Sequence, residues 1–426
     1  HPKQFLKLLG ETTLFQQSVS RMVALQNNTF KIKEILIVTN ENHRFLLNEQ
    51  LDEMKIKIPT RILLEPEPRN TAPALTLAAL AAEEKKPESL LVITPADHYV
   101  KNLEEFTLAM HAAIKAIKHK VIVTLGIEPI KPDIGFGYIQ YEGKDLVKNV
   151  LTFKEKPDLK EAQKMINQGQ HVWNGGMFIL QSKTWLNAIQ QSNSKINHAV
   201  TNSWQQKKID QWFERPDPEI FKQSPSDSID YVVMEKAQEL KLDIKLVLLN
   251  AGWSDLGSFD ALDNIETKDR DGNILKGNVV ALNSKNTIAI TSKKNVSLLG
   301  VENLIVIESA DSVLVANKDD VQSIKQLVKI LEKNYQELLV EHSKVFRPWG
   351  WFEIIEEGSN FKVKRILVNP GAKLSYQSHK YRNEHWVVIK GKATIVFDGQ
   401  QQILDHDEST YIKIGVKHQL MNQEKD

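Results

Sequence analysis

Short apolar runs alternate with helical segments through the first third of the chain. Runs rich in Ile, Val and Leu predict strands at residues 34–39, 60–64, 90–94 and 121–126. The segments between them predict helices at residues 42–54, 72–84 and 103–117. This alternation predicts an α/β fold with a parallel sheet covered on both faces, in which function lies along the carboxyl ends of the strands.

The pattern changes after residue 126. Further strands are predicted at residues 135–140, 151–157, 173–180 and 244–249. The adjacent glycines Gly175 and Gly176 lie inside one of these strands, where glycine marks a bulge or a close approach of the backbone, often to a ligand.

The last third of the chain contains two further β-rich regions. Short strands separated by polar turns at residues 278–282, 286–290, 296–299, 304–307 and 312–316 predict a small β-solenoid or sandwich. A packing or linking helix is predicted at residues 319–340. From residue 346 onward, short alternating strands without helices predict a β-barrel or jelly roll. We therefore expect domains at residues 1–268, 269–342 and 343–426.

Composition excludes several classes of function. The chain has 426 residues, and its 55 basic and 54 acidic side chains give a net charge of +1, which provides no general field for nucleic acid or an anionic membrane. The absence of cysteine excludes disulfides, thiolate nucleophiles and cysteine-ligated zinc, and it fits a cytoplasmic location. The longest apolar run, residues 74–82, is too short to cross a bilayer. We expect a soluble protein that is not exported.

Two aspartates follow predicted buried strands. Pro95 ends the strand at residues 90–94 just before Asp97, which places this carboxylate where a phosphate-bound divalent metal is held in open α/β sheets. Capping of the next helix is the alternative. Asp255 follows the strand at residues 244–249 in a glycine-flanked turn, where a role as helix N-cap would also explain it. If the two carboxylates meet, they are suited to share one Mg²⁺.

Two other stretches carry candidate ligand groups. The sequence Glu-Pro-Glu-Pro-Arg-Asn-Thr-Ala-Pro-Ala at residues 65–74 enters a helix that Asn70 or Thr71 can cap. This helix start suits an anion or a base edge, although a rigid turn explains it equally well. Glu155 and Lys156, before a proline, suit a sugar hydroxyl and a phosphate; a solvated strand end is the alternative.

The C-terminal region contains a candidate metal site. Gln377 and His379 share one face of a predicted strand because side chains alternate with a period of two. Glu384 and His418 complete a set of nitrogen and oxygen ligands suited to zinc or a similar divalent ion. Histidines that only pack inside a barrel are the alternative.

These stretches together resemble the bifunctional mannose-1-phosphate guanylyltransferase/mannose-6-phosphate isomerase family over essentially the whole chain. In the first domain the resemblance rests on Pro2-Lys3-Gln4-Phe5-Leu6, Glu-Pro-x-x-Arg-Asn-Thr-Ala-Pro-Ala, Pro-Ala-Asp-His, Phe-Lys-Glu-Lys-Pro, Trp-Asn-Gly-Gly-Met-Phe and Trp-Ser-Asp-Leu-Gly. In the last domain, Arg347-Pro348-Trp349-Gly350 and Gln-x-His-x-x-Arg-x-Glu-His-Trp resemble the type II isomerase cupin.

The resemblance implies a Rossmann-like nucleotidyltransferase domain with a mixed, mainly parallel sheet. It would make GDP-mannose and pyrophosphate from GTP and mannose 1-phosphate with Mg²⁺, for polysaccharide biosynthesis. By position in the family motifs, metal would be held by Asp97 and Asp255, phosphates by Lys3 and Lys156, the nucleotide by Arg69, Asn70, Ala72 and Asp97, and the sugar by Gly137, Glu155 and Asn174.

The cupin would interconvert mannose 6-phosphate and fructose 6-phosphate with Zn²⁺ or another divalent metal. Its ligands would be Gln377, His379, Glu384 and His418, and Arg382 would stabilise the enediolate or the phosphate. A homo-oligomer is compatible with this family.

Two departures from the family pattern matter for the expected activity. The family's glycine-rich triphosphate loop belongs before His1, and the chain ends soon after Asn422, before the strands that close the cupin. We therefore expect a piece of a longer active protein that does not itself make GDP-mannose at a useful rate. Two other functions stay open: a non-catalytic nucleotide-sugar sensor, against which the paired acids argue, and a protein active only as an isomerase.

Overall fold

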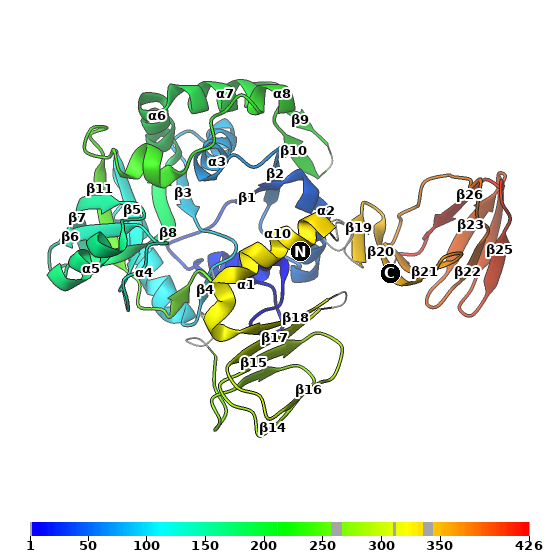
Figure 1. Ribbon diagram of the computed structural model, residues 1–426. Coiled ribbons are helices and arrows are strands. Elements are labelled where there is room, and N and C mark those ends of the chain that lie inside the picture. The colour runs from blue at the N-terminus through cyan, green and yellow to red at the C-terminus, as the bar shows by residue number, and fades with distance from the viewer. Residues whose placement is uncertain (1, 211, 257–265, 310–311, 335–343, 426) are drawn as a thin grey trace. The chain divides into compact units, whose positions relative to one another are not determined.

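Two sheets form the framework of the first unit of the protein. The structure, a computed structural model, describes residues 2–210, 212–256, 266–309, 312–334 and 344–425, and the chain divides into His1–Glu266 and Thr267–Asp426. In the first unit, a six-stranded sheet has the order β3 (Leu90–Ile93), β8 (His171–Gln181), β5 (Val121–Ile127), β11 (Asp243–Leu248), β7 (Val147–Lys154) and β6 (Tyr138–Glu142). A four-stranded sheet has the order β1 (Ile35–Asn40), β2 (Thr60–Glu65), β10 (Phe213–Arg215) and β9 (Lys208–Ile209) (Figure 1).

The six-stranded sheet is mixed, and antiparallel neighbours prevail in it. β5 and β11 are parallel, and β1 and β2 are parallel in the other sheet, as the alternation of strands and helices predicted. β8, however, runs antiparallel to both of its main neighbours, β3 and β5. β6 and β7 form an antiparallel pair, and β8 then returns beside β6 instead of crossing over the sheet. The mixed sheet that the resemblance implied is confirmed, whereas the expectation that its strands run mainly parallel was wrong.

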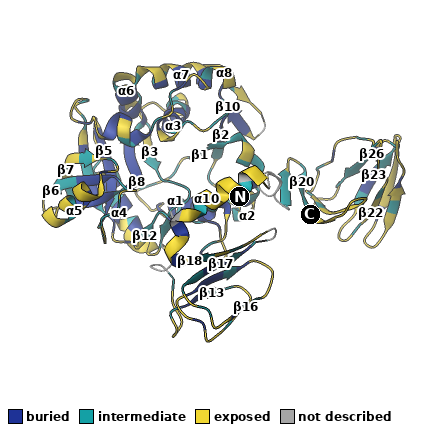
Figure 2. Cartoon of the chain, viewed as in Figure 1, coloured by how far each residue is buried: buried dark blue, intermediate teal, exposed yellow. Residues whose placement is uncertain are grey.

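Helices cover both faces of this sheet. The described helices of the first unit are α1 (Leu14–Ala24), α2 (Arg44–Met54), α3 (Thr71–Lys85), α4 (Leu103–Lys115), α5 (Leu159–Gln168), α6 (Ser182–Ser192), α7 (Ser194–Gln205) and α8 (Pro218–Phe221). Ile122 of β5 packs in a cluster with α3, α6 and α7, whereas Val123 packs with α4 on the opposite face. Every residue of β5 is buried, which makes it the central strand of the unit (Figure 2).

The first part of the second unit is a solenoid of stacked strands. β13 (Ile274–Lys276), β15 (Ile288–Thr291) and β17 (Leu304–Glu308) pair in parallel, as do β14 (Val279–Leu282) and β16 (Val296–Leu299). β18 (Val313–Asn317) closes the stack antiparallel to β17. Parallel pairing between successive coils confirms the solenoid and excludes the sandwich. The helix expected at residues 319–340 is a 3-10 turn, η4 (Lys318–Ser323), followed by α10 (Ile324–Asn334); residues 335–340 lie outside the described part.

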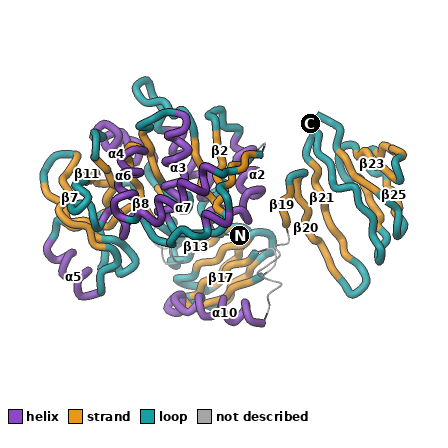
Figure 3. Tube along the Cα trace, turned by 90° about the horizontal axis from the view of Figure 1, so that it is seen from above, coloured by secondary structure: helices purple, strands orange, loops and turns teal. Residues whose placement is uncertain are grey.

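The last part of the chain is an antiparallel β structure, and its described residues contain no helix (Figure 3). Its strands are β19 (Lys344–Arg347), β20 (Gly350–Glu357), β21 (Lys362–Val368), β22 (Glu384–Val387), β23 (Ala393–Phe397), β24 (Gln400–Leu404), β25 (Ser409–Ile412) and β26 (His418–Met421). Gln377 and His379 were predicted to lie on a strand, but the structure places both on irregular chain. Only an isolated bridge joins Gln377 to His418 there, because the segment follows β26 for too few residues to form a ladder.

Within the described residues, no helix combines the length and the apolar character needed to cross a membrane.

Glu308 is a buried carboxylate that stabilises a turn of the solenoid. Its Oε2 accepts hydrogen bonds from Thr291 Oγ1 at 2.8 Å, from the backbone N–H of Ser292 at 2.7 Å and from that of Lys293 at 3.0 Å. Burial raises the pKa of Glu308, but these donors outweigh it and bring the pKa down to about 2. The ionised carboxylate therefore joins β17 to the turn that follows β15.

We expect the substitution Glu308→Gln to lower the free energy of unfolding by about 1–3 kcal/mol at neutral pH, since the amide oxygen is a weaker acceptor for these donors and the N–H₂ group is buried at the Oε1 position, which has no hydrogen-bond partner among the described residues. The folded-state pKa lies below the ordinary value of 4.5, so the stabilisation by Glu308 is present above pH 4.5 and is lost as the pH falls toward 2. Denaturant unfolding at pH 7 and pH 3 measures this. The difference in the free energy of unfolding between the parent protein and the variant should be smaller at pH 3 than at pH 7. Glu302→Gln, at an exposed glutamate of the same solenoid, should leave the free energy of unfolding unchanged at both pH values. A difference that does not depend on pH would contradict the assignment.

Candidate functional site

The turn after β3 places Asp97 at the carboxyl end of the sheet. Residues 94–98 leave the strand and lead into β4 (Tyr99–Val100), which pairs with β12 (Trp253–Ser254). Asn102, and not Asp97, caps helix α4, because its Oδ1 accepts the N–H groups of Glu104 and Glu105. The capping alternative for Asp97 is therefore excluded, and its carboxylate is available for another partner.

Lys3 brings the two predicted metal-binding aspartates together. Its Nζ lies 3.0 Å from Asp97 Oδ2 and donates to the backbone oxygen of Asp255 at 2.5 Å. Pairing of Tyr99 with Ser254 holds the two chain segments side by side. Three residues from distant parts of the sequence thus meet at one point of the sheet edge, where the Lys3 ammonium contacts the Asp97 carboxylate and the Asp255 backbone oxygen.

Helix α1 fixes the backbone of this turn. Ser18 Oγ donates to the oxygen of Pro95 at 3.1 Å, and Arg21 Nη2 donates to the oxygen of His98 at 2.9 Å. Arg21 is buried, and burial lowers its pKa to about 10. Sequence reasoning had no ground for singling out Arg21, because a basic residue in an amphipathic helix is usually solvated. The structure shows that α1 positions the strand end that carries Asp97.

His98 is neutral at physiological pH. Burial lowers its pKa to about 4, against the opposing effect of Asp97 and Asp255. Its Nδ1 accepts the indole N–H of Trp253 at 3.2 Å, and the two rings meet edge to face. With Nδ1 as the acceptor, the remaining proton resides on Nε2, which lies 3.9 Å from Asp97 Oδ1. His98 therefore packs the β4–β12 pair against the site without adding charge.

The predicted sugar residues also converge. The N–H of Asn174 donates to the oxygen of Gly137 at 2.8 Å. Glu155 lies so close to Gly137 that a Cβ added to the glycine would stand 2.4 Å from Glu155 Oε2. Lys156 Nζ is 3.7 Å from Glu155 Oε1, and its side chain is half exposed. Thr124 of β5 donates to Asn174 Oδ1 at 3.2 Å, which ties this cluster to the central strand.

Asp230 belongs to this cluster, although sequence reasoning missed it. Its Oδ1 accepts from Asn174 Nδ2 at 2.8 Å, and it begins a π-helical turn, η3 (Asp230–Met234). Burial raises the pKa of Asp230 to about 6; burial and the charge of Asp230 together raise that of Glu155 to about 7. A π turn has no recognisable sequence pattern, but such turns often occur at functional sites. The sequence therefore contained no local signal for Asp230.

The turn at residues 66–72 is well ordered by its own contacts. Arg69 pairs with Glu67 and donates to the oxygen of Lys222 at 2.7 Å. Asn70 caps α3 by accepting the N–H of Thr71 at 2.8 Å, with a left-handed φ of 68°. Ala72 is fully buried, and its N–H donates to the oxygen of Asp227 at 3.1 Å. Arg69 and Asn70 thus stand at the helix start, whereas the Ala72 amide is already used within the fold.

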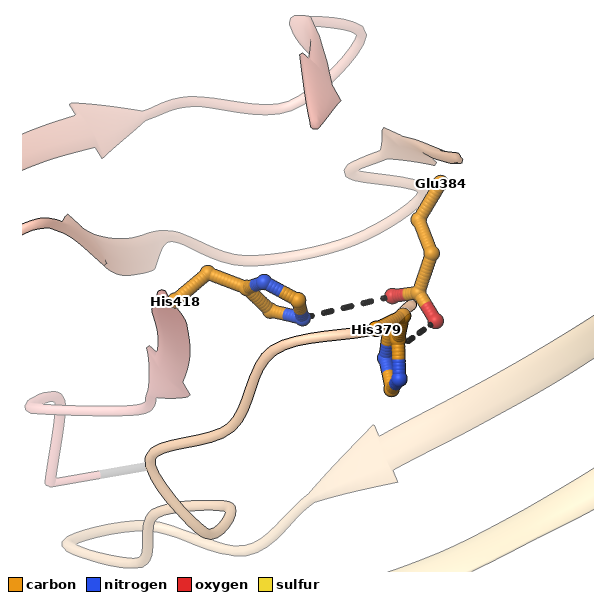
Figure 4. A group of neighbouring side chains, drawn as sticks. All are labelled: His379, Glu384 and His418. Atoms are coloured by element: carbon orange, nitrogen blue, oxygen red, sulfur yellow. Dashed lines mark ion pairs between the residues drawn. The ribbon is translucent and has the colours of Figure 1, made fainter. Parts of the chain in front are cut away.

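Three of the four predicted ligands in the C-terminal part form a compact group. His379, Glu384 and His418 each offer a ligand atom, and these atoms lie within 4.8 Å of one another. Figure 4 shows the two imidazoles on either side of the carboxylate, with Glu384 Oε1 2.9 Å from His379 Nε2 and Oε2 3.6 Å from His418 Nε2. His418 Nδ1 lies 2.9 Å from the oxygen of Val416, to which it donates, so Nε2 keeps its lone pair. That buried Nε2 has no hydrogen-bond partner among the described residues, as expected of a ligand atom.

The neighbours of this group are also placed. Arg382 Nε donates to Glu384 Oε1 at 2.9 Å, and its Nη2 lies 3.1 Å from His379 Nε2. Gln377 exchanges two backbone hydrogen bonds with His418, which brings it beside the group. His385 contacts the ring of Tyr411 instead.

Comparison with known proteins gives the same division of the chain. A nucleotidyl transferase family model matches residues 1–272, a MannoseP isomerase/GMP-like β-helix domain model matches residues 277–331, and a mannose-6-phosphate isomerase C-terminal model matches residues 334–425. The xanthan biosynthesis protein XanB of Xanthomonas campestris pv. campestris (strain B100) is 39% identical over 425 residues, covering 100% of this chain and 89% of that protein. A mannose-1-phosphate guanylyltransferase of Salmonella montevideo is 38% identical over 434 residues, with coverage of 100% and 89%.

Solved structures agree with these relatives. A crystal structure described as a mannose-1-phosphate geranyltransferase from Thermus thermophilus has a TM-score of 0.66 and 29% identity, and the match covers 78% of this chain and 92% of that one. A mannose-6-phosphate isomerase from Helicobacter pylori has a TM-score of 0.54 and 31% identity, with coverage of 60% and 94%.

The fold and the acidic strand ends define a nucleotidyltransferase joined to a β-helix and a cupin-type isomerase domain. Within that class, the chain belongs to the family of mannose-1-phosphate guanylyltransferases that carry a C-terminal mannose-6-phosphate isomerase domain.

A substitution at Gly137 tests whether the cluster of Gly137, Glu155 and Asn174 binds the sugar. We expect Gly137→Ala to displace Glu155, because the new methyl group would overlap Glu155 Oε2 and stand 3.2 Å from the Phe153 ring. Affinity for the sugar phosphate should fall by about tenfold or more with little change in nucleotide affinity, measured by calorimetry on the full-length protein. Gly135→Ala is the matched control, since its Cβ would come no closer than 3.1 Å to the Asp133 side chain. Equal sugar phosphate affinity in both variants would remove Glu155 from the sugar pocket.

Proposed function

We propose that the first unit transfers the guanylyl group of GTP to mannose 1-phosphate, forming GDP-mannose and pyrophosphate. The observation that carries this proposal is the meeting of Lys3, Asp97 and Asp255 at the carboxyl edge of the sheet. The named activities of the relatives and the separate cluster of Gly137, Glu155 and Asn174 support the assignment of the substrate.

We place the domain boundaries at residues 268 and 342.

Asp97 and Asp255 are suited to hold Mg²⁺. Their carboxylates provide the hard oxygen ligands that this ion prefers, and the ammonium group of Lys3 beside Asp97 shows that the position favours positive charge. When bound, Mg²⁺ would neutralise the charge that develops on the triphosphate. Neither aspartate needs to provide covalent chemistry, because phosphoryl transfer depends chiefly on positioning and electrostatic stabilisation.

The protein's own side chains then have distinct tasks. The half-exposed Lys156 is placed to bind the phosphate of mannose 1-phosphate. The Glu155 carboxylate would accept hydrogen bonds from sugar hydroxyls, and the Asn174 amide lies beside it in the same cluster. Lys3 is placed to neutralise the α-phosphate that the sugar phosphate attacks. Arg69 and Asn70 border the nucleotide at the start of α3.

We propose that the cupin interconverts mannose 6-phosphate and fructose 6-phosphate. His379, Glu384 and His418, with Gln377 as the fourth ligand, fit Zn²⁺ or another divalent metal, since the orphaned His418 Nε2 points to a missing partner. The bound metal would polarise the carbonyl group of the open sugar. Arg382 would stabilise the negative charge of the enediolate or hold the phosphate, because its guanidinium stands at the exposed side of the group.

We expect Asp97→Asn and Asp255→Asn to lower the transfer rate of the full-length protein by about 10²-fold or more, because each removes a metal-holding charge and leaves the packing intact. Pyrophosphate release from GTP and mannose 1-phosphate measures the rate. Asp243→Asn is the control: this exposed aspartate starts β11 at the opposite end of the strand. Near-normal turnover by either site variant would contradict the proposed role, as would an equal loss in the control.

We expect His379→Ala to lose divalent metal from the cupin, since it removes one of the three convergent ligands. Metal content of purified full-length protein, measured by mass spectrometry, should fall by about one equivalent, and isomerase activity should fall with it. His385→Ala is the control, because His385 contacts Tyr411 instead of the group. Equal metal content in the parent protein and in His379→Ala would exclude His379 as a ligand.

A further inference from the structure

Trp386 is an aromatic residue of the cupin to which the proposed function assigns no task. It lies on β22, two residues after Glu384, and side chains two apart on a strand point to the same face. The residues at these two positions are partly buried, whereas His385 and Val387, which alternate with them, are exposed. The indole of Trp386 therefore lies on the same side of β22 as the Glu384 carboxylate.

The indole contacts two of the three convergent side chains of the candidate metal site. Its Nε1–H donates to Glu384 Oε2 at 3.0 Å. Its ring meets the imidazole of His418 edge to face, with the ring centroids 5.3 Å apart and the planes inclined by 82°. His418 is buried, and its Nδ1 donates to the oxygen of Val416. Trp386 thus restrains both the acidic ligand and the buried imidazole.

The two oxygens of Glu384 are held by donors of different charge. Arg382 Nε donates to Oε1 at 2.9 Å, and the Arg382 side chain is 59% exposed. Trp386 donates to Oε2 from a partly buried position, and its N–H carries no net charge. A cation bound to the carboxylate repels a guanidinium, but it does not repel a neutral indole. The hydrogen bond from Trp386 is therefore compatible with a bound metal ion.

We propose that Trp386 is the positioning residue of the cupin metal site: it holds the Glu384 carboxylate and the His418 imidazole in the orientation that binds a divalent metal. The inference rests on the proposed function of the cupin and deepens it. A ligand side chain that is fixed before the metal arrives loses less freedom on binding. Hydrogen-bond donors to metal ligands contribute about 10- to 100-fold to metal affinity.

The competing role for Trp386 is packing alone, in which the N–H meets the carboxylate because a buried indole needs an acceptor. The two roles differ in what the N–H contributes to metal binding. Trp386→Phe keeps an aromatic ring beside His418 and removes the donor to Glu384. A packing role leaves the metal affinity of this variant unchanged, whereas a positioning role lowers it. Trp386→Leu removes the donor and the ring contact together.

The test is the affinity of the full-length protein for Zn²⁺, measured by competition with a chromophoric chelator while excess Mg²⁺ occupies the transferase edge. The Zn²⁺ site that is lost in His379→Ala identifies the cupin site. We expect Trp386→Phe to weaken Zn²⁺ binding at this site by about tenfold, and Trp386→Leu by about 10²-fold. Circular dichroism of the metal-free proteins should be the same. If one of the two variants does not fold, the other carries the test.

A double-mutant cycle shows whether Trp386 acts through the carboxylate. In a Glu384→Ala background the indole N–H has no acidic ligand to position, so Trp386→Phe should change the Zn²⁺ affinity there by less than about twofold. Trp351→Phe is the matched control, because the Trp351 ring lies 4.0 Å from the Lys344 ammonium instead, and it should leave the Zn²⁺ affinity unchanged.

Equal Zn²⁺ affinity in the parent protein and in Trp386→Phe would overturn the proposal. It would also be overturned by an equal loss in the Glu384→Ala background, or by a parent protein without a Zn²⁺ site that depends on His379. These affinities do not require turnover. A protein that binds Zn²⁺ but does not interconvert mannose 6-phosphate and fructose 6-phosphate would refute the proposed isomerase reaction, while the Zn²⁺ affinities would still decide the role of Trp386.

Discussion

The contact of one lysine with two acidic strand ends is the constraint on which the transferase site depends. Asp97 and Asp255 belong to segments far apart in the sequence, and like charges at one sheet edge repel unless a cation lies with them. Lys3 supplies that charge and contacts both segments. Under the proposed function, a divalent metal at Asp97 and Asp255 would add positive charge to the same balance.

That constraint explains why several neighbouring side chains form hydrogen bonds to the backbone of the turn that carries Asp97. Ser18 and Arg21 of α1 hold the oxygens of Pro95 and His98, and the β4–β12 pair fixes Asp255 relative to this turn. An acidic residue at the end of a strand is useful only if the turn that carries it cannot move. The rigidity here comes from a buried arginine and a neutral histidine, which fill the space behind the carboxylates without adding a competing ligand for the metal.

Sequence reasoning succeeded where local chemistry decides the structure. The strand of Leu-Leu-Val-Ile, the proline after it and the aspartate beyond follow from periodicity and from the missing N–H of proline. The expected burial of this strand was wrong, because β3 lies at the edge of the sheet, Leu90 is exposed and the other three residues are only partly buried. It failed where long-range pairing decides: no local pattern shows that β8 inserts antiparallel beside β5, or that His379 stands on irregular chain. Asp230 and Arg21 were missed for the same reason, since their importance lies in partners that folding brings near, Asn174 for one and the His98 carbonyl for the other.

The two candidate metal sites of the protein offer a cation different kinds of ligand. The transferase edge sets the Asp97 carboxylate and the Asp255 backbone oxygen against the amine of Lys3, and oxygen ligands of this kind suit a hard cation. The cupin sets two imidazoles against one carboxylate, a combination that suits a softer ion with stronger nitrogen ligation. In the cupin, Arg382 shares Glu384 Oε1 with His379, so the guanidinium competes with the metal for the same oxygen. Filling the metal position would therefore release Arg382 from the carboxylate, and under the proposed function its guanidinium would then be available to an anionic substrate.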